Sequence, residues 1–117
     1  MTITKAARPT IKFYYSDQLK DELILQQILY GAEEEGIPVE MQKVPEANVL
    51  ELAHKASKDS VLGTGIGVSS SYAAVHYEKL PVDRPVYLVR LNAGDEAVRR
   101  VGVNGARLVK RMPLKIK

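Results

Sequence analysis

Three consecutive glutamates are the first side chains in this sequence with the potential for chemistry. Glu33, Glu34 and Glu35 lie in the stretch GAEEEGIP, where a helical pattern ends. The C-terminal end of a helix is partially negative, so an exposed carboxylate there costs about 0.3–1 kcal/mol. On a helical wheel Glu34 points almost directly away from the apolar stripe, Glu33 lies on a flank and Glu35 lies nearer the core edge. Glu34 is therefore free to contact something outside the domain, and a solvated helix end is the alternative.

A glycine string, GTGIG at residues 63–67, is the next candidate, because glycines can cradle phosphates. No Lys follows it, as a Walker-type phosphate loop requires, and it precedes a hairpin rather than a helix, unlike a dinucleotide-binding turn. We interpret the glycines as positions where a helix or another backbone approaches the sheet closely.

The two histidines and the serine cluster complete the candidates. His54 and His76 have no Asp, Glu or His at a spacing that resembles a zinc site, and the cobalamin-binding pattern D-x-H-x-x-G is absent. We expect both to be surface or packing residues, and residues 69–71, SSS, to form a turn. The sequence therefore predicts no catalytic residue and no cofactor-binding residue.

The composition is that of one globular domain. The 117 residues are 45% hydrophobic and 26% charged, which predicts a single domain over 1–117 with a flexible segment at 1–9. The chain has no cysteine, which excludes disulfides, thiolate metal sites and a thiol nucleophile. It has neither a secretion signal nor an apolar run of the ~20 residues that cross a bilayer, so we expect a cytoplasmic protein without membrane contact.

Hydrophobic periodicity predicts the order β-α-β-α-β-β-β-α. The expected fold is α/β: a mixed, mostly parallel sheet of about five strands with helices packed on it. Gly36 is expected to end the first helix, and the apolar run VYLVRL at 86–91 is expected to be buried on both faces. The predicted strands are 10–15, 37–44, 62–69, 72–77 and 86–91, and the predicted helices are 19–35, 46–58 and 95–111.

The last helix combines an apolar stripe with a basic face. The stripe comprises Val98, Val101, Gly105, Leu108, Val109 and Met112, with Gly102 beside it, and the basic residues are Arg99, Arg100, Arg107, Lys110 and Arg111. A solvated face whose cations favour the helix dipole is one interpretation. Nucleic-acid binding is the alternative, although no aromatic stacking platform accompanies these cations.

Three blocks of sequence carry a family resemblance. GAEEEGIPVEMQ, GTGIGVSSSYAAVHYEKLP and RRVGVNGARLVKRMPL resemble the small (beta) subunit of the diol/glycerol dehydratase-reactivating factors, and the resemblance extends from about Ile11 to Leu114. The medium subunit of adenosylcobalamin-dependent diol/glycerol dehydratase is similar in the same blocks. That subunit usually carries an extra N-terminal segment, so the direct start into the first strand favours the reactivating factor. The basic tail has no place in the family pattern.

The resemblance implies a non-catalytic, chaperone-like role. Such a small subunit pairs with a large actin-like ATPase subunit, in a heterotetramer of two large and two small chains. The factor releases damaged cobalamin from an inactivated B12-dependent diol or glycerol dehydratase by subunit exchange, while ATP is hydrolysed on the large subunit. The middle glutamate of the E-E-E-G run, Glu34 here, faces the large subunit and helps to hold a divalent cation, Mg²⁺ or Ca²⁺.

Several alternatives stay open at this stage. The resemblance implies no cofactor for this chain apart from that shared cation. A medium-subunit-like structural component of a B12-dependent dehydratase is the first alternative, and a small nucleic-acid-binding domain that uses the basic last helix is the second. Neither the preferred diol of the target enzyme nor association with a bacterial microcompartment follows from the sequence.

Overall fold

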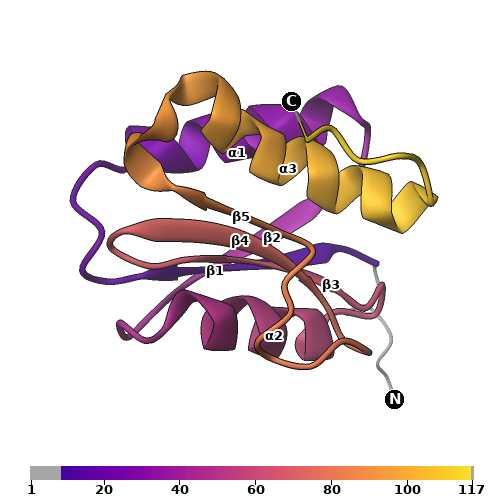
Figure 1. The fold of residues 1–117 in the computed structure, drawn as a ribbon, viewed down its shortest axis with the longest axis horizontal. Coiled ribbons are helices and arrows are strands. Elements are labelled where there is room, and N and C mark those ends of the chain that lie inside the picture. The colour runs from indigo at the N-terminus through magenta and orange to yellow at the C-terminus, as the bar shows by residue number, and fades with distance from the viewer. Residues whose placement is uncertain (1–8, 117) are drawn as a thin grey trace, which may run out of the picture.

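The chain folds into a five-stranded sheet with helices on both faces. The computed structural model describes residues 9–116, so the predicted flexibility of 1–9 falls outside it except for Pro9. The predicted order of elements is confirmed, with a short 3-10 turn (η2) before the last helix (Figure 1). The elements are β1 (Ile11–Ser16), α1 (Leu23–Glu34), β2 (Val39–Val44), α2 (Val49–Asp59), β3 (Thr64–Val68), β4 (Tyr72–Tyr77), β5 (Tyr87–Arg90), η2 (Leu91–Ala93) and α3 (Asp95–Lys110).

The strands are arranged in the order β2-β1-β3-β4-β5. β1 is parallel to both β2 and β3, whereas β4 is antiparallel to both β3 and β5. The hairpin between β3 and β4 turns at the serine cluster, where the Ser69 hydroxyl accepts hydrogen bonds from the backbone N–H groups of Ser71 and Tyr72 at 3.2 and 3.1 Å. The predictions of a mixed sheet and of a serine turn are both confirmed. The sheet is not mostly parallel, however, because two of its four strand pairings are parallel and two are antiparallel.

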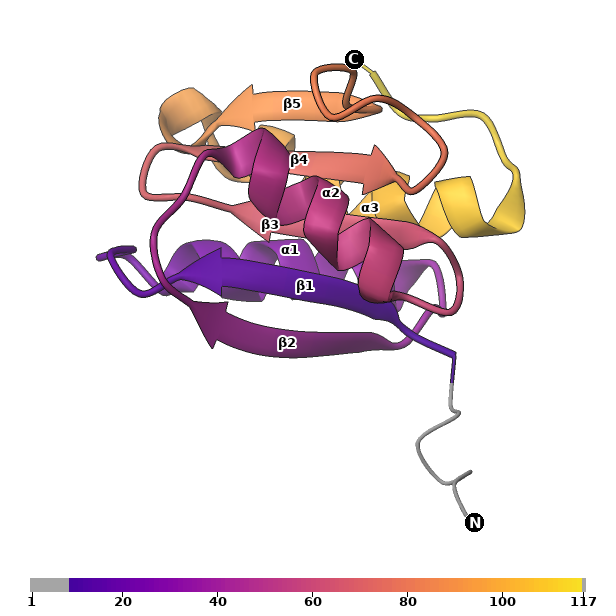
Figure 2. The ribbon, with the colours of Figure 1, turned by 90° about the horizontal axis from the view of Figure 1, so that it is seen from below.

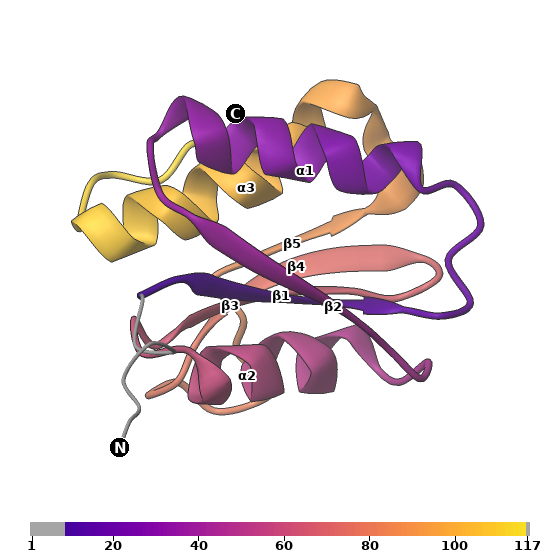
Figure 3. The ribbon, with the colours of Figure 1, turned by 180° about the vertical axis from the view of Figure 1, so that it is seen from behind.

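The helices form two unequal layers. α1 and α3 cover one face of the sheet and α2 covers the other (Figures 1 and 3). Seen from the α2 side, α2 crosses the central strands, and β2 and β5 form the two edges of the sheet (Figure 2). The main core cluster comprises Ile11, Phe13, Leu25, Ile28, Ile66, Val68, Ala73, Val75, Val98, Val101 and Ala106.

Glycines set the distances between these layers. A Cβ atom at Gly65 would lie 2.2 Å from the backbone nitrogen of Ser57, and one at Gly67 would lie 2.4 Å from that of Ala53. The predicted close approach of a helix to this strand is therefore confirmed, with α2 as the helix. On the opposite face α1 and α3 touch through their backbones, because a Cβ atom at Gly102 would lie 1.9 Å from the carbonyl oxygen of Ile28.

Two predictions about burial are wrong. Residues of β5 alternate between half-buried and exposed, with Leu88 44% exposed, because β5 is an edge strand with a neighbour on one side only. Met112, which we placed on the apolar stripe, is 42% exposed. α3 ends at Lys110, and Arg111 adopts the left-handed conformation with φ of 59°, so Met112 leaves the helical face.

The remaining differences are shifts of one to four residues at the ends of strands and helices, the largest at the starts of α1 and α2. α1 begins at Leu23, whose N–H donates to the side chain of Asp21. α2 begins at Val49, and the side chain of Asn48 caps it by accepting from the N–H of Leu50 at 2.8 Å. Gly36 has φ of +78° just after α1, as predicted for a helix-ending glycine. Among the described residues, no helix has both the length and the apolar character to cross a membrane.

Candidate interaction site at the end of the first helix

The glutamate run lies where two helix ends meet. α1 and α3 run in the same direction, and their C-terminal ends lie side by side (Figures 1 and 3). Both ends carry partial negative charge, so their proximity favours cations between them. The last turn of α3 supplies two, Arg107 and Lys110.

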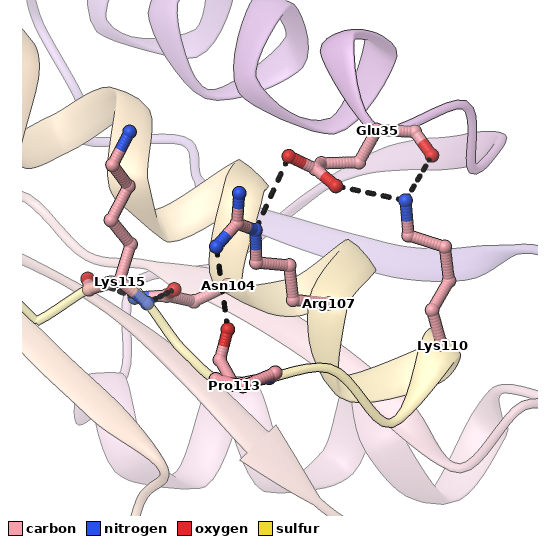
Figure 4. A network of polar contacts seen from close by, with 6 residues as sticks. All are labelled: Glu35, Asn104, Arg107, Lys110, Pro113 and Lys115. Atoms are coloured by element: carbon pink, nitrogen blue, oxygen red, sulfur yellow. Dashed lines mark hydrogen bonds and ion pairs between the residues drawn. The ribbon is translucent and has the colours of Figure 1, made fainter.

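Glu35 is the residue that these cations hold. Its carboxylate accepts hydrogen bonds from Lys110 Nζ at 2.8 Å and from Arg107 Nε at 3.2 Å (Figure 4). Lys110 Nζ also donates to the backbone carbonyl of Glu35 at 2.9 Å, which satisfies an otherwise unpaired carbonyl at the end of α1. The Glu35 side chain is only 14% exposed. The hydrogen bond from Lys110, followed by that from Arg107, lowers the pKa of this carboxyl against the opposing effect of desolvation.

Glu34 occupies the outer side of the same helix end. Its side chain is 52% exposed, and its carboxylate lies 3.5 Å from Arg99 Nη1. Arg99 is held mainly by Gln27, to whose Oε1 atom it donates from Nη2 at 2.9 Å and from Nε at 3.3 Å. The prediction that Glu34 points away from the core is therefore confirmed. Glu33 is exposed, and within residues 9–116 it makes no ion pair.

The basic face of α3 differs from the solvated surface that we expected. Arg99, Arg107 and Lys110 face the acidic end of α1. Arg100 donates to Glu96 of its own helix at 3.1 Å. Four of the five cations on this face are thus paired with carboxylates of the same chain. A face occupied in this way is poorly placed to neutralise phosphates, so the arrangement does not favour the nucleic-acid alternative.

A shallow hollow of mixed charge surrounds Glu34. It has a volume of about 330 Å³ and is lined by Glu34, Asp95, Glu96, Arg99, Arg100, Val103 and Lys115. A glutamate carboxylate is the hard oxygen ligand that Mg²⁺ and Ca²⁺ prefer. Within residues 9–116, however, no three His, Cys, Asp or Glu side chains are grouped so that they could hold a metal ion. Within residues 9–116 Glu34 therefore offers a single carboxylate, and a cation bound there would need its other ligands from water or another chain.

A larger hollow of about 680 Å³ lies at the carboxyl ends of β1, β2 and β5. Ligands of open α/β sheets commonly bind at such an edge. Its carboxylates, however, serve the chain itself: Glu46 accepts from the backbone N–H and hydroxyl of Ser70, and Asp21 accepts from the N–H of Leu23. The geometry therefore gives this hollow no defined ligand chemistry.

The histidines come together, which the sequence did not indicate. The rings of His54 and His76 lie 4.7 Å apart, edge to face. His76 is fully buried, with Nε2 donating to the carbonyl of Val82 at 2.9 Å and Nδ1 accepting from the N–H of Tyr77 at 3.0 Å. Both ring nitrogens of His76 are therefore occupied, and it serves as a packing residue that anchors the loop before β5.

Sequence reasoning missed one polar residue of structural importance in this region. Asn104 of α3 is fully buried and bonds both backbone groups of Lys115. The signal was present, because Asn104 follows Val101 by three residues and so continues the buried face of the helix.

Comparison with known proteins places this arrangement in a family. The sequence profile described as "dehydratase medium subunit" matches residues 8–115. The propanediol dehydratase-reactivating factor small subunit of Citrobacter freundii is 40% identical over 75% of this chain and 76% of its own length. The diol dehydratase-reactivating factor small subunit of Klebsiella michiganensis is 37% identical over 77% and 72%.

Solved structures agree with these relatives. A chain from a diol dehydratase-reactivating factor complexed with ADP and Mg²⁺ superposes with a TM-score of 0.86 at 33% identity, covering 93% of this chain and 99% of that one. A chain of glycerol dehydratase reactivase gives a TM-score of 0.87 at 26% identity, with coverage of 92% and 97%. The protein therefore belongs to the dehydratase medium subunit family and, within it, to the small subunits of the diol and glycerol dehydratase-reactivating factors.

Proposed function

We propose that this chain is the non-catalytic subunit of a factor that releases damaged cobalamin from an inactivated B12-dependent diol or glycerol dehydratase. Its partner in this proposal is a large actin-like ATPase subunit, and two chains of each kind form the heterotetramer. The observation that carries the proposal is the match over nearly the whole length of a chain from a solved reactivating factor. ATP hydrolysis takes place on the large subunit.

Subunit exchange is the mechanism that fits this family membership. The matching profile is named for the medium subunit of the dehydratase, so the chain shares that subunit's sequence pattern over residues 8–115. A chain of this shape can take the place of the medium subunit without contributing any chemistry. The exchange loosens the holoenzyme, damaged cobalamin leaves, and intact adenosylcobalamin enters.

Glu34 is the residue that we assign to the interface with the large subunit. Of the three glutamates, Glu35 is committed to α3, whereas Glu34 keeps a carboxylate that is half exposed. It supplies one oxygen ligand to a divalent cation, Mg²⁺ or Ca²⁺, that is shared with the partner. Arg99 can give up the Glu34 carboxylate to a cation without losing all its partners, because its Nε and Nη2 atoms also donate to Gln27.

The test substitutes the carboxylate without altering its size. Glu34→Gln is expected to weaken assembly with the large subunit about tenfold in the presence of Mg²⁺, because a neutral amide is a poorer ligand for a hard cation. Glu33→Gln is the matched control, since Glu33 is an exposed neighbour on the same helix. With a chelator present, wild type and Glu34→Gln should assemble equally. Equal assembly of the two proteins under both conditions would exclude the cation role.

The name of the family profile, dehydratase medium subunit, is compatible with one alternative function: the chain could be a structural component of the dehydratase itself. A pull-down from the source organism separates the two functions. We expect the tagged chain to recover an actin-like ATPase subunit. Recovery of dehydratase chains without that ATPase would contradict the proposed function.

A further inference from the structure

The segment that follows α3, Met112–Ile116, is held in place by a buried side chain; we refer to it as the C-terminal strap. Asn104 is fully buried in α3. Its Nδ2 atom donates to the carbonyl of Lys115 at 3.0 Å, and its Oδ1 atom accepts from the N–H of Lys115 at 2.7 Å (Figure 4). A residue in a sheet exchanges the same two bonds with a neighbouring strand. The contact therefore fixes the backbone of the strap independently of its side chains.

A second set of contacts turns the chain back and joins it to α1. Arg111 adopts the left-handed conformation, and the N–H of Met112 donates to the carbonyl of Arg107 at 2.9 Å, which reverses the chain. Arg107 Nη1 also reaches the carbonyl of Pro113 at 3.4 Å, while its Nε atom holds Glu35. One arginine thus contacts the strap and the glutamate run together, as Figure 4 shows.

The strap brings one of its side chains, that of Lys115, to the surface that carries Glu34. Lys115 lines the same hollow as Glu34 and Arg99. Ile116 is 71% exposed and Met112 is 42% exposed, so the anchoring by Asn104 does not serve to bury them. A buried amide in a helix is unfavourable unless it is fully hydrogen-bonded. The arrangement therefore uses a buried polar residue to hold a strap whose apolar and basic side chains remain outside.

We propose that the C-terminal strap is part of the docking surface for the large subunit, with Asn104 as the residue that positions it. This inference rests on the proposed function, which places Glu34 at that interface. The strap contains Lys115 and no acidic residue, and it follows the basic end of α3. Its complement on the partner is an acidic surface with an apolar contact for Ile116. The strap and Glu34 form one continuous surface because Lys115 borders the Glu34 hollow.

The experiment removes one hydrogen bond without touching the core. Lys115→Pro deletes the N–H group that donates to Asn104, whereas Lys115→Ala keeps that group and removes the same side-chain charge. Loss of a hydrogen bond to a buried group shifts an equilibrium about tenfold. In the full-length chain we therefore expect trypsin to cleave after Arg111 about tenfold faster in Lys115→Pro than in Lys115→Ala. We expect assembly with the large subunit from the same organism to be about tenfold weaker, with or without chelator.

A chain that ends at Arg111 provides a second variant, and circular dichroism checks that its fold is unchanged. It should lose assembly at least as strongly as Lys115→Pro, because it lacks the whole strap. Assembly of Lys115→Pro at the level of Lys115→Ala, despite faster cleavage, would overturn the inference and leave the proposed function intact. Equal cleavage rates would refute the positioning role of Asn104. Failure of the wild-type chain to assemble would instead refute the proposed function.

Discussion

The hydrogen bond between Tyr14 and Asp59 makes the free energy of unfolding fall as the pH rises into the alkaline range. Tyr14 lies on β1, is 6% exposed and faces α2, where its hydroxyl donates to the carboxylate of Asp59. Lys55 lies 3.6 Å from the same carboxylate. Burial, and then the hydrogen bond to Asp59, raise the pKa of Tyr14 from 10.0 to about 12. The unfolded chain therefore loses this proton more readily than the folded chain does.

The sign and the size of the effect follow from that difference. The contribution of Tyr14 is fully present below pH of about 10 and is lost as the pH rises to about 12. A pKa difference of this size corresponds to at most about 2.7 kcal/mol. Because the Asp59 side chain is 40% exposed and screened by water, we expect a loss of about 1–2 kcal/mol.

The measurement compares wild type with Tyr14→Phe by urea unfolding at several pH values. At pH 8 the substitution should lower the free energy of unfolding by about 1–2 kcal/mol, because a hydrogen bond to a carboxylate is lost. The two proteins should converge between pH 10 and about 12, as the hydroxyl of the wild type ionises. Tyr30→Phe is the control, since Tyr30 is 47% exposed. Parallel pH profiles of wild type and Tyr14→Phe would refute the reasoning.

Two further predictions concern the contact between α1 and α3. Glu35→Gln should lower the free energy of unfolding by about 1–2 kcal/mol at pH 7, because it weakens the hydrogen bonds from α3. The folded state lowers the pKa of Glu35 below 4.5, so this difference in unfolding free energy should vanish as the pH falls through that lowered pKa. A difference that persists in acid would contradict the role of the ionised Glu35 carboxylate. Gly102→Ala should cost several kcal/mol, since its Cβ atom would overlap the α1 backbone. Gly36→Ala, at φ of +78° in open space, should cost only about 1–2 kcal/mol, and thermal unfolding can rank the two variants.

Local pattern was sufficient for the order of the elements and for the role of the glycines. The alternation and spacing of apolar residues reflect which face of each element is buried, and that signal is present within each segment. The close approach at Gly65 and Gly67 was predictable, because glycine weakens a strand and is typical of positions where another backbone comes close. The exact helix starts were not predictable from periodicity, because the side-chain bonds that Asp21 and Asn48 make to N–H groups there are not part of the apolar pattern.

The order of strands in the sheet and the contacts between residues far apart in the chain could not be predicted from the sequence pattern. The apolar run of β5 looks like a central strand, yet its burial depends on which strand lies beside it, and β5 has a neighbour only in β4. Glu35 posed the same difficulty, since its partner Arg107 is 72 positions away in the chain. The outward direction of Glu34 needed only the geometry of its own helix and was predicted correctly. The cation at Glu34 remains a prediction.

The direct contact between the backbones of α1 and α3 also determines how this surface can bind. Gly31 and Gly102 leave no side chain between the two helices, so neither can slide past the other without overlap of main-chain atoms. The backbone positions that carry Glu34 and Arg99, one on each helix, are therefore fixed relative to each other before any partner arrives. A partner that docks on this face meets a preorganised surface, and little of the binding free energy is lost in ordering its backbone.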